Sequence, residues 1–188
     1  KTQSQKTPSN NLKLNTQLYT QVITPGLFLY SLAPKASWKN GPQTLPVNGD
    51  TNDRRGFVRQ ESKAKLSDGK QYSNVLYTHP RWVNRGIIMG TYSDITIPKT
   101  AKAFRTGIGM MYGAQSNNAF TFQILYKPSS GNLVTMVKRT IKYASGVQEV
   151  VYNLPASLKG SKGNLILMVS SNGSSGRGWC VWVNPRFQ

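Results

Sequence analysis

The chain has 188 residues and a mass of 20.8 kDa, which suits one domain with a hydrophobic core. Lys and Arg number 24 against six Asp and Glu, so the formal net charge is +18 at pH 7. One Cys and one His exclude a disulfide framework, a Cys-based zinc finger and a His-rich metal site, and a 10% share of aromatic residues argues against wholesale disorder.

The positive charge is spread along the chain rather than gathered in a tail. Residues 1–100 carry 14 basic and five acidic side chains, and residues 101–188 carry ten and one, so each part has a net charge of +9. We therefore expect a folded surface that is cationic throughout. Such a surface attracts polyanions or acidic proteins through long-range electrostatic steering.

The N-terminal part is polar and basic. We predict a flexible basic arm over residues 1–26 and a single domain over 27–188. The opening run KTQSQKTPSNN has no apolar core of the kind that a signal peptide needs. No stretch of about 18 apolar residues predicts a transmembrane segment. Within the arm, the run 18–23 is strand-like and stops at a Pro-Gly pair.

The rest of the chain alternates between short apolar segments and turn formers. A second apolar run follows at 27–30, and residues 33–56 are rich in turn formers, so we expect a long ordered loop there. No window of about eleven residues shows a helical period. Strands are predicted at 57–60, 64–66, 72–77, 86–92, 95–97, 104–110, 119–126, 133–138, 148–152, 164–170 and 178–184.

This pattern predicts an all-β fold, a two-sheet antiparallel β-sandwich of the jelly-roll kind with a long loop-rich N-terminal part. Segments 165–169 and 179–183 are apolar on both faces. We expect them to be central strands, covered by the opposite sheet on one side and by loops on the other. Phe120, Phe122 and Ile124 fall on one face of their strand, which we predict to face the core.

Two runs carry a resemblance to a known family. These are Tyr-Ser-Asn-Val-Leu-Tyr-Thr-His-Pro-Arg-Trp at 72–82 and Trp-Cys-Val-Trp-Val at 179–183, supported by the runs 33–38, 90–92 and 107–114. Over about residues 27–187 the chain resembles the NPCBM-type, galactose-binding-like jelly-roll modules of bacterial secreted or surface proteins. The resemblance implies a β-sandwich and a secreted or cell-surface location rather than a cytoplasmic one.

The chain departs from that family at two places. Gly178 precedes Trp179 where the family has an Asp-Trp step, and Tyr77, Arg81 and Arg85 stand where relatives tend to carry acidic residues. Both departures remove negative charge. They therefore point to a partner that differs from the family's usual one.

The richest local cluster of functional side chains is the run 79–82 together with Arg85. Trp82 would offer a stacking face, while Arg81 and Arg85 supply bidentate donors for anionic groups. Alternatively, Trp82 fills the core below its loop and His79 bonds to backbone carbonyls. The residues that we predict to contact a ligand or partner are Trp38, Arg81, Trp82, Arg85, Tyr92, Arg177 and Trp179.

Two tryptophans near the C-terminus are three residues apart, so they face opposite ways in a strand. One of Trp179 and Trp182 is expected in the core, and the other beside Arg177, where a cation–π contact could form. Cys180 shares the face of Trp182 and is expected to be a small buried hydrophobic residue.

The sequence offers no set of catalytic or metal-binding residues. The loop 48–53 brings oxygen ligands together, but its two carboxylates are followed by two arginines, so we expect Asx turns rather than a calcium site. The six acidic residues lie mostly in predicted turns and do not suggest the carboxylate pair of a glycosidase. A single imidazole, with no Gly-x-Ser-x-Gly elbow and no P-loop, leaves nucleophilic catalysis without support. We expect no enzyme, metal or cofactor.

The sequence therefore predicts a non-catalytic module that binds an anionic polysaccharide or another cell-envelope polymer. The alternative is a structural subunit or linker that docks onto acidic proteins in a larger assembly or surface fibre, in which case the chain would work as an oligomer or assembly component. We do not expect nucleic acid as the partner, because aromatic and basic residues do not interleave on one strand face.

Overall fold

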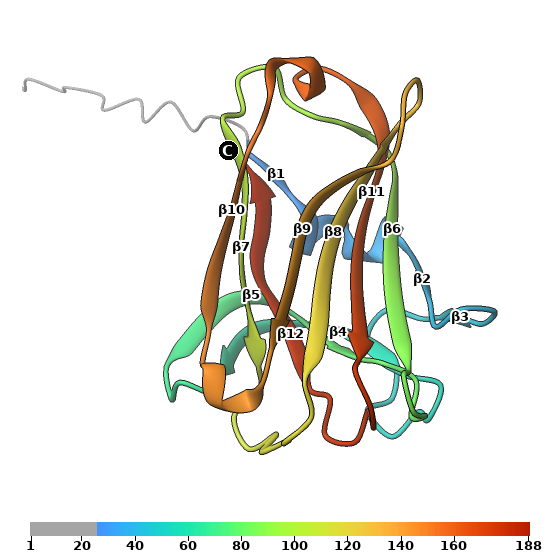
Figure 1. Cartoon of the computed structure of the whole chain (residues 1–188), viewed down its shortest axis with the longest axis vertical. Helices are drawn as coiled ribbons and strands as arrows, with labels where there is room; N and C mark the ends of the chain where they lie inside the picture. The colour runs from blue at the N-terminus through green and yellow to red at the C-terminus, as the bar shows by residue number, and fades with distance from the viewer. Residues whose placement is uncertain (1–25) are drawn as a thin grey trace, which may run out of the picture.

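The computed structural model describes residues 26–188, which form two antiparallel sheets packed face to face (Figure 1). Residues 1–25 of the predicted arm (1–26), together with its strand at 18–23, lie outside the described residues. The elements are β1 (Leu27–Phe28), α1 (Leu29–Leu32), η1 (Ala33–Lys35), β2 (Ser37–Lys39), β3 (Thr44–Leu45), β4 (Phe57–Lys65), β5 (Gln71–His79), β6 (Ile87–Thr96), β7 (Ala103–Met110), β8 (Phe120–Pro128), β9 (Val134–Ile141), η2 (Tyr143–Ser145), β10 (Gln148–Asn153), η3 (Ala156–Leu158), β11 (Lys162–Ser171) and β12 (Cys180–Phe187).

The strand order confirms the predicted two-sheet sandwich. One sheet runs β10-β7-β12-β5-β4, with β1 also paired to β12, and the other runs β3-β2-β6-β11-β8-β9. Neighbouring strands pair antiparallel in both sheets. β11 lies between β6 and β8, and β12 lies between β7 and β5. The two segments that are apolar on both faces are therefore central strands, as expected.

The core is built from alternate side chains of the facing strands. Phe120, Phe122 and Ile124 of β8 are fully buried, which confirms the predicted core face of that strand. Trp182 of β12 is fully buried opposite them, with its ring centroid 5.0 Å from that of Phe122 and the two planes at 74°. Burying a side chain of this size contributes about 2–3 kcal/mol to the stability of the fold. This aromatic contact is therefore an important part of the packing between the two sheets.

The two central strands differ on the faces that point away from the core. Val181 of β12 is fully buried in a second apolar cluster, where it packs with Phe57 and Tyr77 on the outer face of its own sheet. Ile166 and Met168 of β11 stay partly exposed. The loop cover that we expected over the outer face of β11 is therefore incomplete.

Residues 33–56 contain more regular structure than predicted. β2 pairs with β6, and Trp38 lies directly opposite Gly90. A Cβ atom on Gly90 would come within 2.5 Å of the Trp38 ring, so a glycine here makes room for the indole. The Trp38 Nε1–H donates to the Ala33 carbonyl at 3.1 Å. The single turn of α1 is too short to produce a periodic signal in the sequence.

One end of the sandwich, at the bottom of Figure 1, holds the connections β5–β6, β7–β8, β9–β10 and β11–β12. The β8–β9 hairpin lies at the opposite end. Within residues 26–188, none of the helices has both the length and the apolar character that crossing a membrane requires.

Candidate functional site

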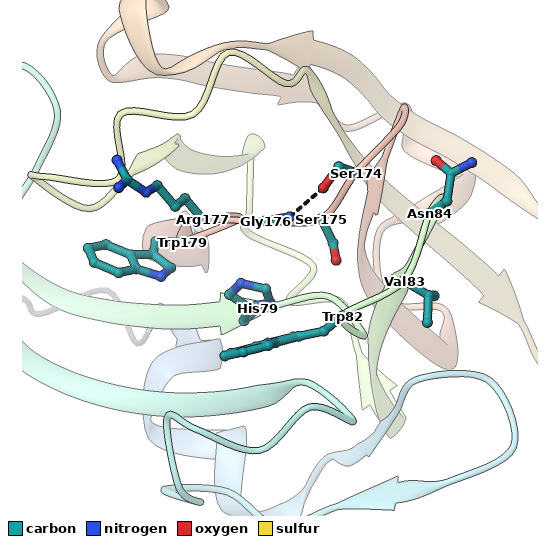
Figure 2. Close-up of a pocket in the computed structure, with 9 residues that line it drawn as sticks. All are labelled: His79, Trp82, Val83, Asn84, Ser174, Ser175, Gly176, Arg177 and Trp179. Atoms are coloured by element: carbon teal, nitrogen blue, oxygen red, sulfur yellow. Dashed lines mark hydrogen bonds between the residues drawn. The ribbon is translucent and has the colours of Figure 1, made fainter.

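A hollow of about 580 Å³ opens where the β5–β6 loop meets the β11–β12 loop (Figure 2). Its walls come from segments that are almost a hundred residues apart in the sequence. The residues that line it are His79, Trp82, Val83, Asn84, Ser174, Ser175, Gly176, Arg177 and Trp179.

The β5–β6 loop is a tight turn that presents Trp82 to solvent. The Trp82 N–H donates to the Arg54 carbonyl at 3.0 Å, and the Gly86 N–H donates to the Val83 carbonyl at 3.1 Å. A Cβ atom on Gly86 would fall 1.9 Å from the Arg81 carbonyl oxygen, so the backbone can close in this way only around a glycine. The turn leaves the Trp82 side chain 42% exposed.

The opposite wall belongs to the β11–β12 loop and is tied to the first loop. The Arg85 N–H donates to the Gly173 carbonyl at 2.8 Å, which joins the two loops directly. The Gly176 N–H donates to Ser174 Oγ at 3.1 Å (Figure 2). Arg177 adopts a φ of +54°, a left-handed conformation at which the chain turns towards Trp179. The two walls of the hollow are therefore tied together by a backbone hydrogen bond.

A row of aromatic rings leads from the outer apolar cluster to Trp82. The centroid of Phe57 lies 4.9 Å from that of Tyr77 and 5.5 Å from that of His79. His79 in turn lies 5.3 Å from Trp82, with the ring planes at 42°. The exposed indole thus rests on a row of buried rings, which restricts its orientation.

Two of the residues that line the hollow are ionisable, His79 and Arg177. His79 is 2% exposed, and its Nδ1 lies 2.6 Å from the Pro80 carbonyl oxygen, so Nδ1 carries the proton that is donated. Burial lowers the pKa of His79, opposed by that hydrogen bond. The ring is therefore neutral at pH 7, and its Nε2 is a hydrogen-bond acceptor. This is the backbone-bonded state that we considered for His79, whereas Trp82 does not fill the core.

The structure brings three of the predicted contact residues together in the hollow, namely Trp82, Arg177 and Trp179. Arg81 and Arg85 are exposed on the β5–β6 loop but do not line the hollow. Trp179 is partly exposed, whereas Trp182 is in the core, which confirms that these two residues face opposite ways.

The prediction of a ligand contact is wrong for two residues, Trp38 and Tyr92. Trp38 is 1% exposed and Tyr92 is 2% exposed, and their rings pack edge to face at 6.2 Å. Positions 88, 90 and 92 of β6 point into the core, so Tyr92 is held between the sheets. The open space at Gly90 lets Trp38 join it there. Neither side chain reaches a surface ligand.

Several lining residues were not predicted, namely Val83, Asn84, Ser174, Ser175 and Gly176. A pattern in the sequence could have identified three of them, Ser174, Ser175 and Gly176. The run Ser170–Gly178 consists of small and polar residues between two apolar central strands, which marks a loop at the end of the sheet. That this loop meets residues 80–86 depends on the strand order, which the sequence does not show.

The carboxylates of the loop 48–53 are bound by a backbone N–H of the loop and by the neighbouring Arg55. Asp50 Oδ1 accepts the Asn52 N–H at 2.9 Å, as in the Asx turn that we expected. Both oxygens of Asp53 are bound by the Arg55 side chain, at 3.0 and 2.7 Å. The hydrogen bonds from Arg55 lower the pKa of Asp53 against the opposing effect of burial. Within residues 26–188, no group of three or more His, Cys, Asp or Glu side chains could hold a metal ion.

Sequence comparisons find no relatives: none of the known family models matches the chain, and no curated protein is significantly similar to it. Structural comparisons do find similar proteins. The CBM27-1 module of Caldicellulosiruptor saccharolyticus, solved in complex with mannohexaose, is 12% identical, with a TM-score of 0.55 over 87% of this chain and 96% of that chain.

Two weaker similarities are to larger chains. Clostridium perfringens ZmpB, solved as its CBM51-2 and INT domains with GlcNAc, is 15% identical, with a TM-score of 0.44 over 69% of this chain and 25% of that one. The CBM22-1–GH10 modules of the Clostridium thermocellum xylanase 10B, solved with xylohexaose, are 9% identical, with a TM-score of 0.43 over 81% and 26%. Taken with the strand order, the match to the CBM27-1 module shows that residues 26–188 share the antiparallel β-sandwich fold of that module.

Proposed function

We propose that this chain is a non-catalytic module that binds an anionic glycan, and that the hollow between the β5–β6 and β11–β12 loops holds one of its sugar units. The observation that carries the proposal is the exposed indole of Trp82, which shares one hollow with Trp179 and Arg177. A large aromatic ring that is exposed on a rigid support stabilises the fold less than a buried ring does. It offers a ligand a flat apolar face on which to pack.

The polar groups of the hollow suit a sugar. Aromatic faces can pack against the C–H faces of a sugar ring, and a few polar side chains in a largely apolar site fix its orientation. Ser174 and Asn84 can both donate and accept hydrogen bonds, and His79 Nε2 can accept one from a hydroxyl group.

The charge of the hollow favours an anionic sugar. Arg177 lines it, and Arg81 and Arg85 are exposed on the neighbouring loop. Guanidinium groups bind carboxylate and sulfate groups with paired hydrogen bonds. None of the residues lining the hollow is Asp or Glu, so this part of the described chain does not offer the two carboxylates that glycoside hydrolysis uses.

The fold and the local sequence agree with this proposal. The similar module of Caldicellulosiruptor saccharolyticus was solved with mannohexaose bound. The runs 72–82 and 179–183, which resemble NPCBM-type modules, contribute Trp82 and Trp179 to the hollow. A module that binds a polysaccharide would work at a cell surface or in secreted form, and we include that location in the proposal.

Affinity electrophoresis through gels containing polygalacturonate tests the proposal, with neutral galactan gels run in parallel at moderate salt. The wild-type chain should be retarded by polygalacturonate. Trp82→Ala should weaken binding about tenfold or more, the scale of a buried aromatic anchor. Leu133→Ala is the matched control, because Leu133 is also exposed and lies in the β8–β9 hairpin at the opposite end. If polygalacturonate retarded Trp82→Ala as strongly as the wild type, the proposal would be overturned.

The same arginines would attract acidic proteins, which is the alternative that the sequence leaves open. Polyglutamate added at equal charge concentration separates the two. If it displaces the polysaccharide completely, and if Trp82→Ala binds both polymers as the wild type does, the chain is a docking subunit for acidic proteins instead. Sedimentation of the isolated chain should show a monomer if the glycan proposal holds.

A further inference from the structure

A second hollow, of about 330 Å³, lies on the outer face of the β10-β7-β12-β5-β4 sheet. Phe104 and Ile108 of β7 point into the core, so Arg105 and Gly107 between them point outwards. The hollow lies about 20 Å further along β12 than Trp179, by the rise per residue of an extended strand. Its lining residues are Tyr72, Arg105, Thr106, Gly107, Val147, Glu149, Val183, Asn184 and Arg186.

Two arginines lie side by side on adjacent strands at this hollow. Arg105 of β7 and Arg186 of β12 are direct partners in the antiparallel ladder, an arrangement in which like charges destabilise a sheet. Arg105 Nη1 donates to Glu149 Oε1 at 2.9 Å. Arg186 bonds only to neutral groups, the Gln188 Oε1 at 2.7 Å and the Asn184 carbonyl at 3.1 Å. One of the two positive charges therefore has no counterion among the described residues.

Two polar atoms of the same hollow have no hydrogen-bond partner within residues 26–188. Arg105 Nε is a donor and Asn184 Oδ1 is an acceptor, and both are shielded from solvent. Unpaired buried polar atoms are uncommon in folded proteins and call for an explanation. A ligand that offers both an acceptor and a donor would satisfy the pair.

Another arginine of the chain shows what the unused edge of Arg105 can do. Arg55 holds both carboxylate oxygens of Asp53 with its Nε and Nη2 atoms, at 3.0 and 2.7 Å. Arg105 uses Nη1 for Glu149, which leaves its Nε–Nη2 edge free. The Arg105 side chain is 35% exposed, but its Nε is itself shielded, so the guanidinium group must turn for a ligand to reach this edge.

The β12 backbone is irregular at this hollow. The register with β7 shifts between Val183 and Arg186, and Asn184 has a φ of +46°. A bulge of this kind re-aims side chains, and left-handed backbone at a non-glycine residue tends to occur at functional sites. The irregularity places the Asn184 amide and the Arg186 guanidinium group in the same wall.

We propose that this hollow binds a uronic acid unit, with the carboxylate held between Arg105 and Arg186 and a hydroxyl group donating to Asn184 Oδ1. Roughly ten water molecules would fill its volume, which is room for one sugar unit. A uronate carries its carboxylate and its hydroxyl donors on one ring, so a single sugar unit can serve both the arginines and Asn184. The site is separate from the Trp82 hollow and stands whether or not that hollow binds a sugar.

The arginine Nε–H signals in ¹H–¹⁵N NMR spectra test this proposal directly. The chain is titrated with trigalacturonic acid and, at matched ionic strength, with neutral galactotriose and with triglutamate. Trigalacturonic acid should shift the Nε–H signals of Arg105 and Arg186, and the other two probes should not. Equal shifts at all arginines, or equal shifts with triglutamate, would overturn it.

Variants separate a specific site from general charge attraction. Arg105→Lys keeps the charge but loses the bidentate edge, and should weaken trigalacturonic acid binding about tenfold. Arg139→Lys, at an exposed position on β9 of the other sheet, is the matched control and should leave the affinity unchanged. Glu149→Gln removes a carboxylate that repels the ligand and competes with it for Arg105, so it should strengthen binding. A weaker complex with Glu149→Gln, or equal losses with Arg105→Lys and Arg139→Lys, would contradict the proposal. Trp82→Ala should leave the Arg105 shift intact, so failure of one site does not imply failure of the other.

Discussion

The buried imidazole of His79 supports the exposed indole of Trp82, with their centroids 5.3 Å apart and their planes at 42°. The hydrogen bond from His79 Nδ1 to the Pro80 carbonyl, at 2.6 Å, fixes the imidazole in place. The orientation of the exposed ring therefore depends on a neutral histidine that solvent hardly reaches. This relationship links the stability of the fold to the shape of the candidate site.

The first prediction concerns the pH dependence of stability. Burial lowers the pKa of His79 below its ordinary value of about 6.5. Below that pH the unfolded chain binds a proton that the native chain does not. The free energy of unfolding should therefore fall as the pH drops through 6.5 and continue to fall until the lowered native pKa is reached. Urea denaturation between about pH 7.5 and pH 5 measures this slope.

His79→Gln is the control for this measurement, because the chain has one His. Glutamine can still donate to the Pro80 carbonyl but does not titrate. Its free energy of unfolding should be nearly flat over the same range. A slope equal to that of the wild type would show that His79 is not the responsible group.

The second prediction concerns the turn that presents Trp82. Gly86→Ala would place a Cβ atom 1.9 Å from the Arg81 carbonyl oxygen, so the turn must open. We expect a loss of at least about 2 kcal/mol in the free energy of unfolding. Weaker glycan binding should accompany it, because Trp82 moves with the turn. Gly173→Ala is the matched control, since its Cβ would meet only Asn118 Oδ1 at 3.9 Å. Similar losses for both variants would contradict this account.

The sequence predicts the fold better than the site. Alternation in β8 and the two central strands are local patterns, and local patterns identify core faces such as that of Phe122. Burial of a single aromatic residue depends instead on what lies opposite. Trp38 stands in a loop-like stretch of the sequence, which is typical of a surface residue. In the structure it is buried because Gly90, in a strand distant in sequence, makes room for its ring. The hollow likewise depends on the meeting of two loops whose contact follows from strand order.

The third prediction tests the corrected role of Trp38. Because its ring lies in the core against Gly90, Trp38→Phe should lower the free energy of unfolding by roughly 1–3 kcal/mol. Affinity for polygalacturonate should be unchanged at a temperature where the variant is folded. Trp82→Phe should show the reverse, with nearly native stability and weaker binding. A loss of affinity in Trp38→Phe without a loss of stability would restore Trp38 as a ligand contact.

The fourth prediction uses Cys180 as a probe of strand β12. Its side chain is fully buried, and burial raises the pKa of the thiol, so a thiol reagent should label it only when β12 opens. Native labelling should be slower than labelling in urea by about three orders of magnitude or more. Cys180 lies in β12 between β7 and β5, and β12 also carries Arg186, while Trp179 immediately precedes it.

A ligand that binds the native state should therefore slow this labelling. The expected factor is one plus the ratio of free ligand concentration to Kd, because binding lowers the population of opened molecules. Trigalacturonic acid should slow the labelling of Cys180 in the wild type and less so in Arg105→Lys. If labelling proceeds at the same rate with and without saturating ligand, the reagent reaches Cys180 through a local movement at Trp179, and the ligand stays bound during that movement. Labelling in Trp82→Ala distinguishes that case, since a local opening at the loop would become faster there while global unfolding would not.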